Sequence, residues 1–196
     1  ISKNASAVGC YDLGILKTNN GYNSTLLNLK ENKFKLVFLF GQDDIKFKKT
    51  NEFVVYVGTH GDHGAEIADV ILPSAAYTEQ DGYYTNLEGK IQKAFKANYP
   101  PGEAKEDWII INELSKILNN KELFLNREYL NDSMMNYLKI SKKKTSLKDE
   151  TGFFVKENIT IDYIDYYYTN VVARSSRTMS ECRNARTNLE KTGTEG

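Results

Sequence analysis

The sequence has little proline and cysteine, and neither charge is in excess. Its 196 residues include three prolines, two cysteines and 26 basic against 26 acidic side chains, which gives a formal net charge of zero. Such a balance provides no general attraction to nucleic acid or to an anionic membrane surface. The longest apolar runs, LVFLF at 36–40 and WIII at 108–111, are far too short to span a bilayer. These absences favour a soluble globular chain, which could still sit beside a membrane through partners.

The two cysteines, Cys10 and Cys182, lie near opposite ends of the chain. They could form one disulfide, but such sparse usage is typical of a reducing compartment. Iron–sulfur clusters usually take four thiolates, so we do not expect this chain alone to hold one. The chain starts at Ile1 and not at Met, so we expect a processed or truncated product, and we find no signal-peptide pattern.

Three apolar runs predict an α/β unit with a parallel sheet. KLVFLFG at 35–41, FVVYVG at 53–58 and ADVILP at 68–73 each end in glycine or proline. Apolar runs of this length without polar alternation are typical of strands buried on both faces. The segments that join them are of helix or loop length, which favours parallel pairing.

The remaining segments predict a hairpin and several helices. YYTNLEGKIQKAF at 83–95 predicts two strands turning near Glu88–Gly89. The segment 100–120, which starts with Pro-Pro-Gly, gives the clearest helix because its apolar residues recur at helical spacing. Further predictions are a short helix ended by Gly14, a short amphipathic helix within 19–33, a helix at 126–140, a charged linker at 141–152 and a short helix at 175–186. We therefore expect an α/β domain over 1–120 and a helical, partly extended C-terminal extension over 121–196.

The aromatic cluster YIDYYY at 163–168 lies in a tail with little predicted core of its own. Such aromatic residues either dock on the parent domain or anchor an interface with a partner. The sequence leaves both interpretations open.

The stretch GTHGDHGAEIADVILP at 58–73 could suggest a metal site, because it contains both histidines of the chain. His60 and His63 are three residues apart across a glycine, with Asp62 and Glu66 beside them. A zinc site needs three or four ligands held by rigid elements, and the helical zinc signature spaces its histidines by four. We therefore predict a polar loop after a strand, whose glycines set the turn and whose histidines have no chemical role.

The same stretch could suggest a phosphate-binding loop, since it is rich in glycine and follows a buried strand. Its G-x-x-G-x-x-G spacing is not the dinucleotide-binding fingerprint, however. No Lys or Arg occurs between positions 50 and 89, whereas seven acidic residues do. A phosphate, or the backbone of a nucleic acid, would meet an anionic neighbourhood here. The sequence contains no G-x-S-x-G nucleophile motif either.

The stretch from Val54 to Gln92, VVYVGTHGDHGAEIADVILPSAAYTEQDGYYTNLEGKIQ, strongly resembles the C-terminal half of the large iron–sulfur subunit of respiratory complex I. The wider molybdopterin-oxidoreductase superfamily is similar in several elements. These are ADVILP at 68–73, Glu79, Asp81–Gly82, Asn86, Glu88–Gly89 and Lys90–Ile91–Gln92. The Gly58–Asp62 loop and PPGEAKEDWIIINELS at 100–115 resemble the complex I version. NASAVGCYDLGI near the start and DYYYTNVVARSSRTMSEC at 165–182 also resemble that subunit. The resemblance is weakest over 119–158.

This resemblance implies a molybdopterin-oxidoreductase-like, Rossmann-like α/β fold. In that family the clusters are bound by cysteine motifs in the N-terminal part of the subunit, and the C-terminal part carries no pterin. We therefore expect a structural role, with no catalytic, cofactor-binding or metal-ligating residue in this chain. Whether it is itself an enzyme stays open, since it would belong to an enzyme complex that transfers electrons from NADH to ubiquinone.

The resemblance also implies where the chain is found and with what. The expected partners are other peripheral-arm subunits, including the cluster-bearing N-terminal part, with no nucleic acid and no direct membrane insertion. The expected location is the matrix side of the inner mitochondrial membrane. The chain would be a fragment or half of a split subunit, and a composition typical of AT-rich codons favours the split gene.

Two alternatives remain open. The chain could be the cofactor-binding fragment of an active molybdenum or tungsten oxidoreductase, such as a formate dehydrogenase. It could also be an interaction module with a metal-stabilised loop at His60 and His63.

Overall fold

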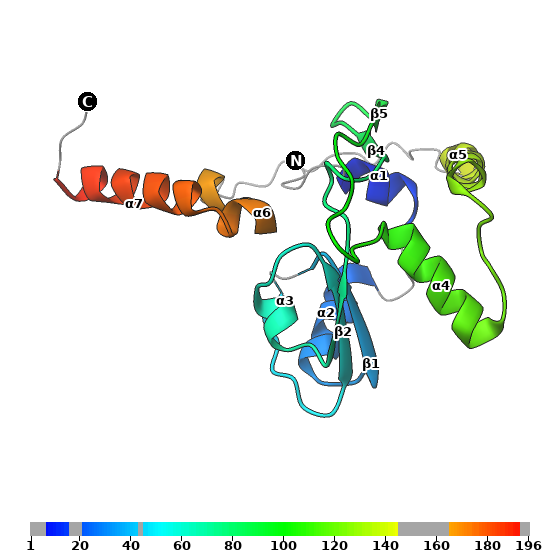
Figure 1. Ribbon diagram of the computed structural model, residues 1–196, viewed down its shortest axis with the longest axis horizontal. Helices are drawn as coiled ribbons and strands as arrows, with labels where there is room; N and C mark the ends of the chain where they lie inside the picture. Colours follow the sequence, from blue (N-terminus) through cyan, green and yellow to red (C-terminus); the bar gives the residue numbers. More distant parts are fainter. Residues whose placement is uncertain (1–6, 16–20, 43–44, 145–164, 193–196) are drawn as a thin grey trace, which may run out of the picture.

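Three parallel strands form the centre of the computed structural model, which describes residues 7–15, 21–42, 45–144 and 165–192. They are β1 (Leu36–Phe40), β2 (Phe53–Gly58) and β3 (Val70–Pro73), and they lie in the order β1-β2-β3 (Figure 1). Phe38 of β1 pairs with Val55 of β2, which pairs in turn with Val70 of β3. The predicted α/β unit with a parallel sheet is confirmed.

Helices cover the two faces of this sheet. On one face, α2 (Gly21–Lys30) and α3 (His63–Glu66) enclose a core cluster of Leu29, Leu39, Phe47, Val54 and Tyr56. On the other face, α4 (Asp107–Asn119) packs Ile110 and Leu114 near Val55, Val57 and Leu72. Figure 1 shows the sheet nearly edge-on, with α3 on one side and α4 on the other. The central strand β2 is therefore buried on both faces, as its sequence predicts.

The prediction that all three strands are buried on both faces is wrong for β1 and β3. Val37 and Leu39 of β1 pack into the core, but Leu36, Phe38 and Phe40 are exposed. The physical reason is position: β1 is at an edge of the sheet, and α4 packs over β2 and β3 instead. β3 lies at the opposite edge, and its Val70 and Ile71 are exposed as well.

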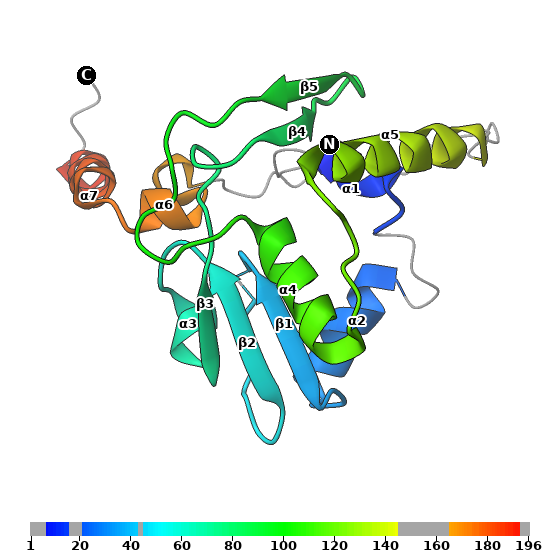
Figure 2. The same ribbon diagram turned by 45° about the vertical axis from the view of Figure 1, so that its right-hand side comes forward.

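The predicted hairpin is confirmed as β4 (Gly82–Thr85) paired antiparallel with β5 (Ile91–Ala94) (Figure 2). Asn86 organises its turn, because the Asn86 Oδ1 atom accepts hydrogen bonds from the amides of Glu88 and Lys90 at 3.1 and 2.9 Å. Gly89 adopts a positive φ of 80° in this turn. At the base of the hairpin, Asp81 Oδ1 accepts a hydrogen bond of 2.8 Å from the amide of Lys96.

The predicted long helix is confirmed as α4, but it begins at Asp107 and not directly after the Pro-Pro-Gly at 100–102. The residues before α4 instead hydrogen-bond to the chain at the end of β3. The amide of Ala75 donates to the carbonyl of Lys105, and the amide of Lys105 donates to the carbonyl of Pro73. Gly102, with a φ of 56°, turns the chain before this extended segment. Asn120 ends the helix in the left-handed conformation that commonly terminates helices.

The other helices largely match the sequence. α1 (Ala7–Asp12) ends two residues before Gly14, whose φ is 73°, and α2 is the predicted short helix within 19–33. The elements that follow α4 are α5 (Arg127–Lys144), η1 (Tyr166–Tyr168), α6 (Val171–Arg174) and α7 (Arg177–Thr192). α5 continues to Lys144, so the start of the predicted linker at 141–152 is helical. Its remainder, and residues 163–164 of the aromatic cluster, lie outside the described residues. In Figure 1, α7 projects away from the rest of the molecule.

The hairpin glycines differ in what they require. We expect Gly89→Ala to lower the free energy of unfolding by about 1 kcal/mol, because a side chain at positive φ is strained. Gly82→Ala should cost less, because Gly82 has no positive φ and its Cβ would meet only the movable ring of Tyr84, at 3.1 Å. Urea denaturation of the two variants measures this difference, and equal losses would contradict it.

Candidate functional site

The carboxyl ends of the three parallel strands open into a crevice of about 250 Å³. Ligands of open α/β sheets bind outside the carboxyl ends of the strands, so this is the first place to look for a site. The crevice is lined by Phe40–Gly41 at the end of β1, Gly58–Thr59 at the end of β2, Ser74–Tyr77 after β3 and Asp107 of α4. The predicted glycine-rich loop therefore starts at the fold's ligand-binding edge.

The C-terminal segment forms one wall of the crevice. Asn170, Val171 and Val172 line it, and Asn170 caps the first turn of α6 by accepting a hydrogen bond of 2.9 Å from the amide of Ala173. Arg174, at the end of α6, donates from Nε to Asp62 Oδ2 at 2.8 Å. The tail is thus tethered to the glycine-rich loop, and two valines occupy part of the ligand-binding edge.

Asp107 is the acidic residue that lines this crevice, and the Asp62–Arg174 ion pair lies nearby. Ser74 donates a hydrogen bond to Asp107, yet burial raises the pKa of the Asp107 carboxyl above its ordinary value. The hydrogen bond from Arg174 lowers the pKa of Asp62. None of the described residues that line the crevice is a Lys or an Arg. An anionic ligand placed there would meet Asp107 without a lining cation to balance it.

The glycine-rich loop is shaped by the ring of Tyr56, which is only 1% exposed. The Tyr56 hydroxyl donates a hydrogen bond of 2.8 Å to the carbonyl of His60. A Cβ on Gly58 would lie 2.4 Å from the Tyr56 ring, and one on Gly64 would lie 2.8 Å from both that ring and the carbonyl oxygen of Gln42. Neither glycine has a positive φ. These two glycines shape the loop by leaving room for the Tyr56 ring.

The two histidines lie in this loop without converging on a common site. His60 Nδ1 is 2.9 Å from Thr59 Oγ1, and His63 Nδ1 is 3.7 Å from Glu66 Oε2. Asp62, between them, pairs with Arg174 and accepts a hydrogen bond from the amide of His63. Within the described residues, no group of three or more His, Cys, Asp or Glu side chains could hold a metal ion. Cys10 and Cys182 are both free thiols.

Most of the acidic motif residues hold the backbone. Asp69 Oδ2 accepts a hydrogen bond of 2.8 Å from the amide of Val54, and the amide of Asp69 donates to the carbonyl of Val54. Lys49 pairs with Asp69 at 2.6 Å and lowers the pKa of that carboxyl. Glu79 Oε2 accepts from the amide of Ala76 at 2.9 Å. These side chains join strands and turns, which is a structural use of residues that the sequence singled out.

Comparison with known proteins bears on the origin of this arrangement. The family model described as molybdopterin oxidoreductase matches residues 1–117. The chain belongs to the molybdopterin oxidoreductase family. A second model, for the C-terminal region of the G subunit of NADH-ubiquinone oxidoreductase, matches residues 136–182.

Several relatives with similar names align along most of the chain. The NADH-ubiquinone oxidoreductase 75 kDa subunit of Reclinomonas americana is 40% identical over 91% of this chain. The G subunit of the NADH-quinone oxidoreductase of Rickettsia bellii is 38% identical over 98%, and the mitochondrial 78 kDa subunit of Candida albicans is 34% identical over 93%. The chain spans only 27–28% of the length of each of these three relatives.

Sequence reasoning found the strand ends and the loop but missed the tail wall. Asp62 and Arg174 are 112 positions apart, and only their opposite charges connect them in the sequence. Asn170–Val172 carry no motif that would direct them to the carboxyl edge of a sheet. The tyrosine cluster stays undecided, since Tyr167 and Tyr168 are half-buried while Tyr166 is 71% exposed.

The loop predicts a sharp difference between neighbouring glycines. We expect Gly64→Ala to lower the free energy of unfolding by about 1–3 kcal/mol, because the carbonyl of Gln42 cannot easily move from the added Cβ. Gly61→Ala is the matched control: its Cβ would meet Ala65 at an ordinary 3.8 Å, so the change should stay within about 0.5 kcal/mol. Thermal or urea unfolding decides, and an equal effect at both positions would show that packing on Tyr56 does not set the loop.

The tail tether predicts a dependence on acid pH. Because the pKa of Asp62 is lowered in the folded chain, the Asp62–Arg174 pair stabilises tail docking above the ordinary aspartate pKa, about 3.9. This stabilisation is lost as the pH falls through the lowered value. An NMR titration of the Arg174 Nε–H signal should show a midpoint below that ordinary value. In Arg174→Gln, the pKa of Asp62 should move back up, and an unchanged Asp62 titration would contradict the pairing.

Proposed function

We propose that this chain is a structural, non-catalytic C-terminal portion of the large iron–sulfur subunit of respiratory complex I. The observation that carries the proposal is the alignment of almost the whole chain with G subunits and 75 kDa subunits, combined with a family model for the C-terminal region of the G subunit. In this role the chain supports the peripheral arm while other parts transfer electrons from NADH to ubiquinone. No catalytic residue is assigned to it.

The absence of a pterin cofactor is part of the proposal, and the crevice supports it. A pterin cofactor of this family is anionic through its phosphate groups, and phosphate sites usually offer cations or several free backbone amides. Here Asp107 lies in the crevice, Val171 and Val172 form a wall, and the lining residues that the structure describes include no cation. The residues present therefore do not fit such a group, and no reaction step is derived through one. Iron–sulfur clusters are assigned to the cysteine-bearing remainder of the subunit.

We assign residues 1–120 to the α/β domain and 121–196 to the C-terminal extension. Two features support a boundary there: the two family models match 1–117 and 136–182, and α4 ends at Asn119. The extension contacts the domain at several places. Arg127 pairs with Glu106, and the Asn112 side chain holds the loop before α5 through the amides of Leu123 and Phe124.

The proposed partners are the cluster-bearing part of the subunit and other peripheral-arm subunits, on the matrix side of the inner mitochondrial membrane. The 75 and 78 kDa relatives and the complex I role support this location. None of the helices described here is long and apolar enough to cross a membrane.

The competing function is that of a cofactor-binding fragment in an active molybdenum or tungsten enzyme, such as a formate dehydrogenase, and the family match over 1–117 favours it. The experiment is purification of complex I from the source organism, followed by mass spectrometry and elemental analysis. We expect peptides of this chain in the complex I band with iron present and neither molybdenum nor tungsten. Stoichiometric molybdenum or tungsten with extractable pterin would support the competitor instead. Absence of the peptides from every complex I band would refute the proposal.

A further inference from the structure

Many large hydrophobic side chains are exposed among the described residues. Twenty-three large hydrophobic side chains are exposed, whereas only ten hydrophobic residues are buried. Isolated apolar residues on a surface are ordinary, but a contiguous apolar patch marks an interaction site. The part of this surface with the clearest structural meaning is the outer strand of the sheet.

Leu36, Phe38 and Phe40 form a row on the α4 side of β1, opposite the core-facing Val37 and Leu39. They are 52%, 39% and 40% exposed, and the rings of Phe38 and Phe40 stack with centroids 6.2 Å apart. Phe53, which pairs with Leu36, extends the row onto β2 and is 48% exposed. We call these four residues the β1 row. It contains no charged or polar side chain.

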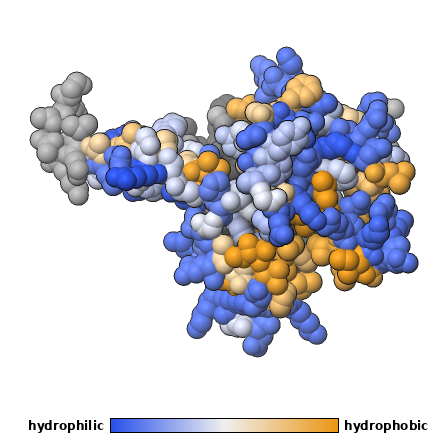
Figure 3. All heavy atoms as spheres, in the orientation of Figure 1, coloured by the Kyte–Doolittle hydropathy of each residue, from blue (hydrophilic) through white to orange (hydrophobic). Residues whose placement is uncertain are grey.

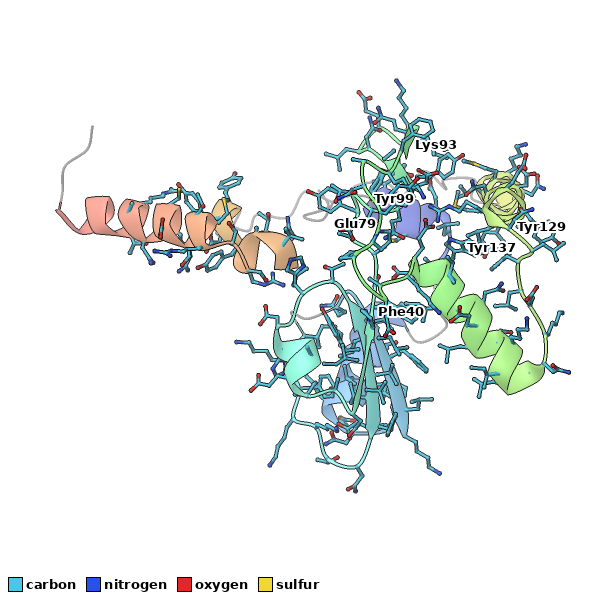
Figure 4. All side chains as sticks on the ribbon, in the orientation of Figure 1. Phe40, Glu79, Lys93, Tyr99, Tyr129 and Tyr137 are labelled. Carbon is cyan, nitrogen blue, oxygen red and sulfur yellow. The ribbon has the colours of Figure 1, made fainter. Side chains whose placement is uncertain are left out.

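The figures show where the β1 row lies. In Figure 3, apolar atoms gather over the part of the molecule that holds the parallel sheet and α4. In Figure 4, Phe40 lies at the end of β1 on the side of the sheet that faces α4. α4 covers Val55 and Val57 of the neighbouring strand but not the β1 row.

The backbone of the same residues is open on the outer side of β1. The carbonyl of Lys35 accepts from Phe53 and the amide of Gly41 donates to Val57, so odd-numbered residues of β1 direct their backbone groups toward β2. In a parallel strand the alternate residues then direct theirs to the opposite side. The amides and carbonyls of Leu36, Phe38 and Phe40 therefore face outward, and among the described residues β1 has no strand partner other than β2.

An apolar strand with open hydrogen-bonding groups is a template for another strand unless charges or proline protect it. β1 has neither, since its sequence is LVFLF. Its pattern is that of an interior strand of a parallel sheet, and such sheets carry helices on both faces. Three strands also fall short of the usual five or six in a sheet. Both observations indicate that the sheet continues beyond β1.

We propose that β1 is the docking edge for a strand–helix unit from the part of the subunit that this chain does not contain. The strand pairs with the outward backbone groups of Leu36, Phe38 and Phe40, and the helix covers the β1 row. The lengths of the relatives point to this occupant. Their alignments cover 91–98% of this chain but only 27–28% of their own sequences. The remaining sequence is long enough to supply the missing layer. This inference rests on the proposed function and adds the surface through which the chain assembles.

The test is site-specific photo-crosslinking in the assembled complex. A photoreactive phenylalanine analogue replaces Phe38 in one variant and Leu87, an exposed residue in the hairpin turn, in the control. After irradiation of purified complex I, mass spectrometry identifies the linked peptides. We expect the position-38 variant to link to a segment of the large subunit outside these 196 residues, and the position-87 variant not to link to that segment. This readout works whether the remaining part is on the same polypeptide or on another.

A second pair of variants adds an energetic test. Phe38→Glu should reduce incorporation into complex I by ~tenfold or more, because docking would bury an unpaired charge. Leu87→Glu should leave incorporation unchanged. Phe38 is 39% exposed and stacks on Phe40, whereas Leu87 is 68% exposed, so the melting temperature of each isolated variant is measured as well, to separate lost folding from lost docking.

The outcomes separate this inference from the function that it rests on. If the unsubstituted chain is absent from complex I, the proposed function fails. If the chain is present but position 38 links to a second copy of itself, to a different subunit or to nothing, the docking edge is wrong and the function stands. Equal incorporation of Phe38→Glu and Leu87→Glu would likewise overturn the docking edge alone.

Discussion

Burial of β2 on both faces is the constraint on which the rest of the structure depends. Val54 and Tyr56 fill the core beneath α2 and α3, while Val55 and Val57 form the layer beneath α4. Val54, Tyr56 and Val57 are each at most 1% exposed. A parallel strand so enclosed needs neighbours on both sides and helices above and below. This chain provides a strand on each side of β2 and helices on both of its faces. Around β1 it provides a neighbouring strand on one side only.

Tyr56 carries this constraint from the core into the loop. Its ring excludes a Cβ at positions 58 and 64, and its hydroxyl fixes the carbonyl of His60. The loop in turn presents Asp62 to Arg174, which tethers the C-terminal segment beside the ligand-binding edge of the sheet. The stretch that most resembles a cofactor loop is therefore shaped by packing and closed by the chain's own tail. The carboxyl edge of the sheet, where related folds usually bind a ligand, here holds the C-terminal segment of the same chain.

Local patterns were sufficient to predict much of the fold. The apolar runs predicted the three strands, the segment around Glu88–Gly89 predicted the hairpin turn, and helical spacing predicted α4. The exposed faces of the edge strands were not predicted. An apolar run indicates that a strand is buried in the complete assembly, and it does not show whether this chain alone buries it. Leu36, Phe38 and Phe40 have that pattern although this chain covers only one face of β1. The start of α4 was displaced because residues near Lys105 hydrogen-bond to the segment around β3, a contact that local propensity does not include.

The site was less predictable than the fold, because its parts come together only through tertiary contacts. No local pattern connects Asp62 with Arg174 or brings Val171 to the end of β2. The sequence drew attention to the glycines of the loop. Glycine is needed at positions 58 and 64 because the Tyr56 ring lies too close for a Cβ, and this distance cannot be read from the sequence. Asn86, Asp81 and Asp69 were recognised through family resemblance, and the structure adds the backbone amides that each one accepts from.

The central claim is that this chain supplies one portion of a larger sheet whose continuation lies beyond β1. Hydrogen–deuterium exchange at the backbone amides of Leu36, Phe38 and Phe40, compared between the isolated chain and purified complex I, tests it most directly. The account predicts rapid exchange of these three amides in the isolated chain and strong protection in the complex, where an incoming strand accepts their hydrogen bonds. Equally rapid exchange in both states would contradict it.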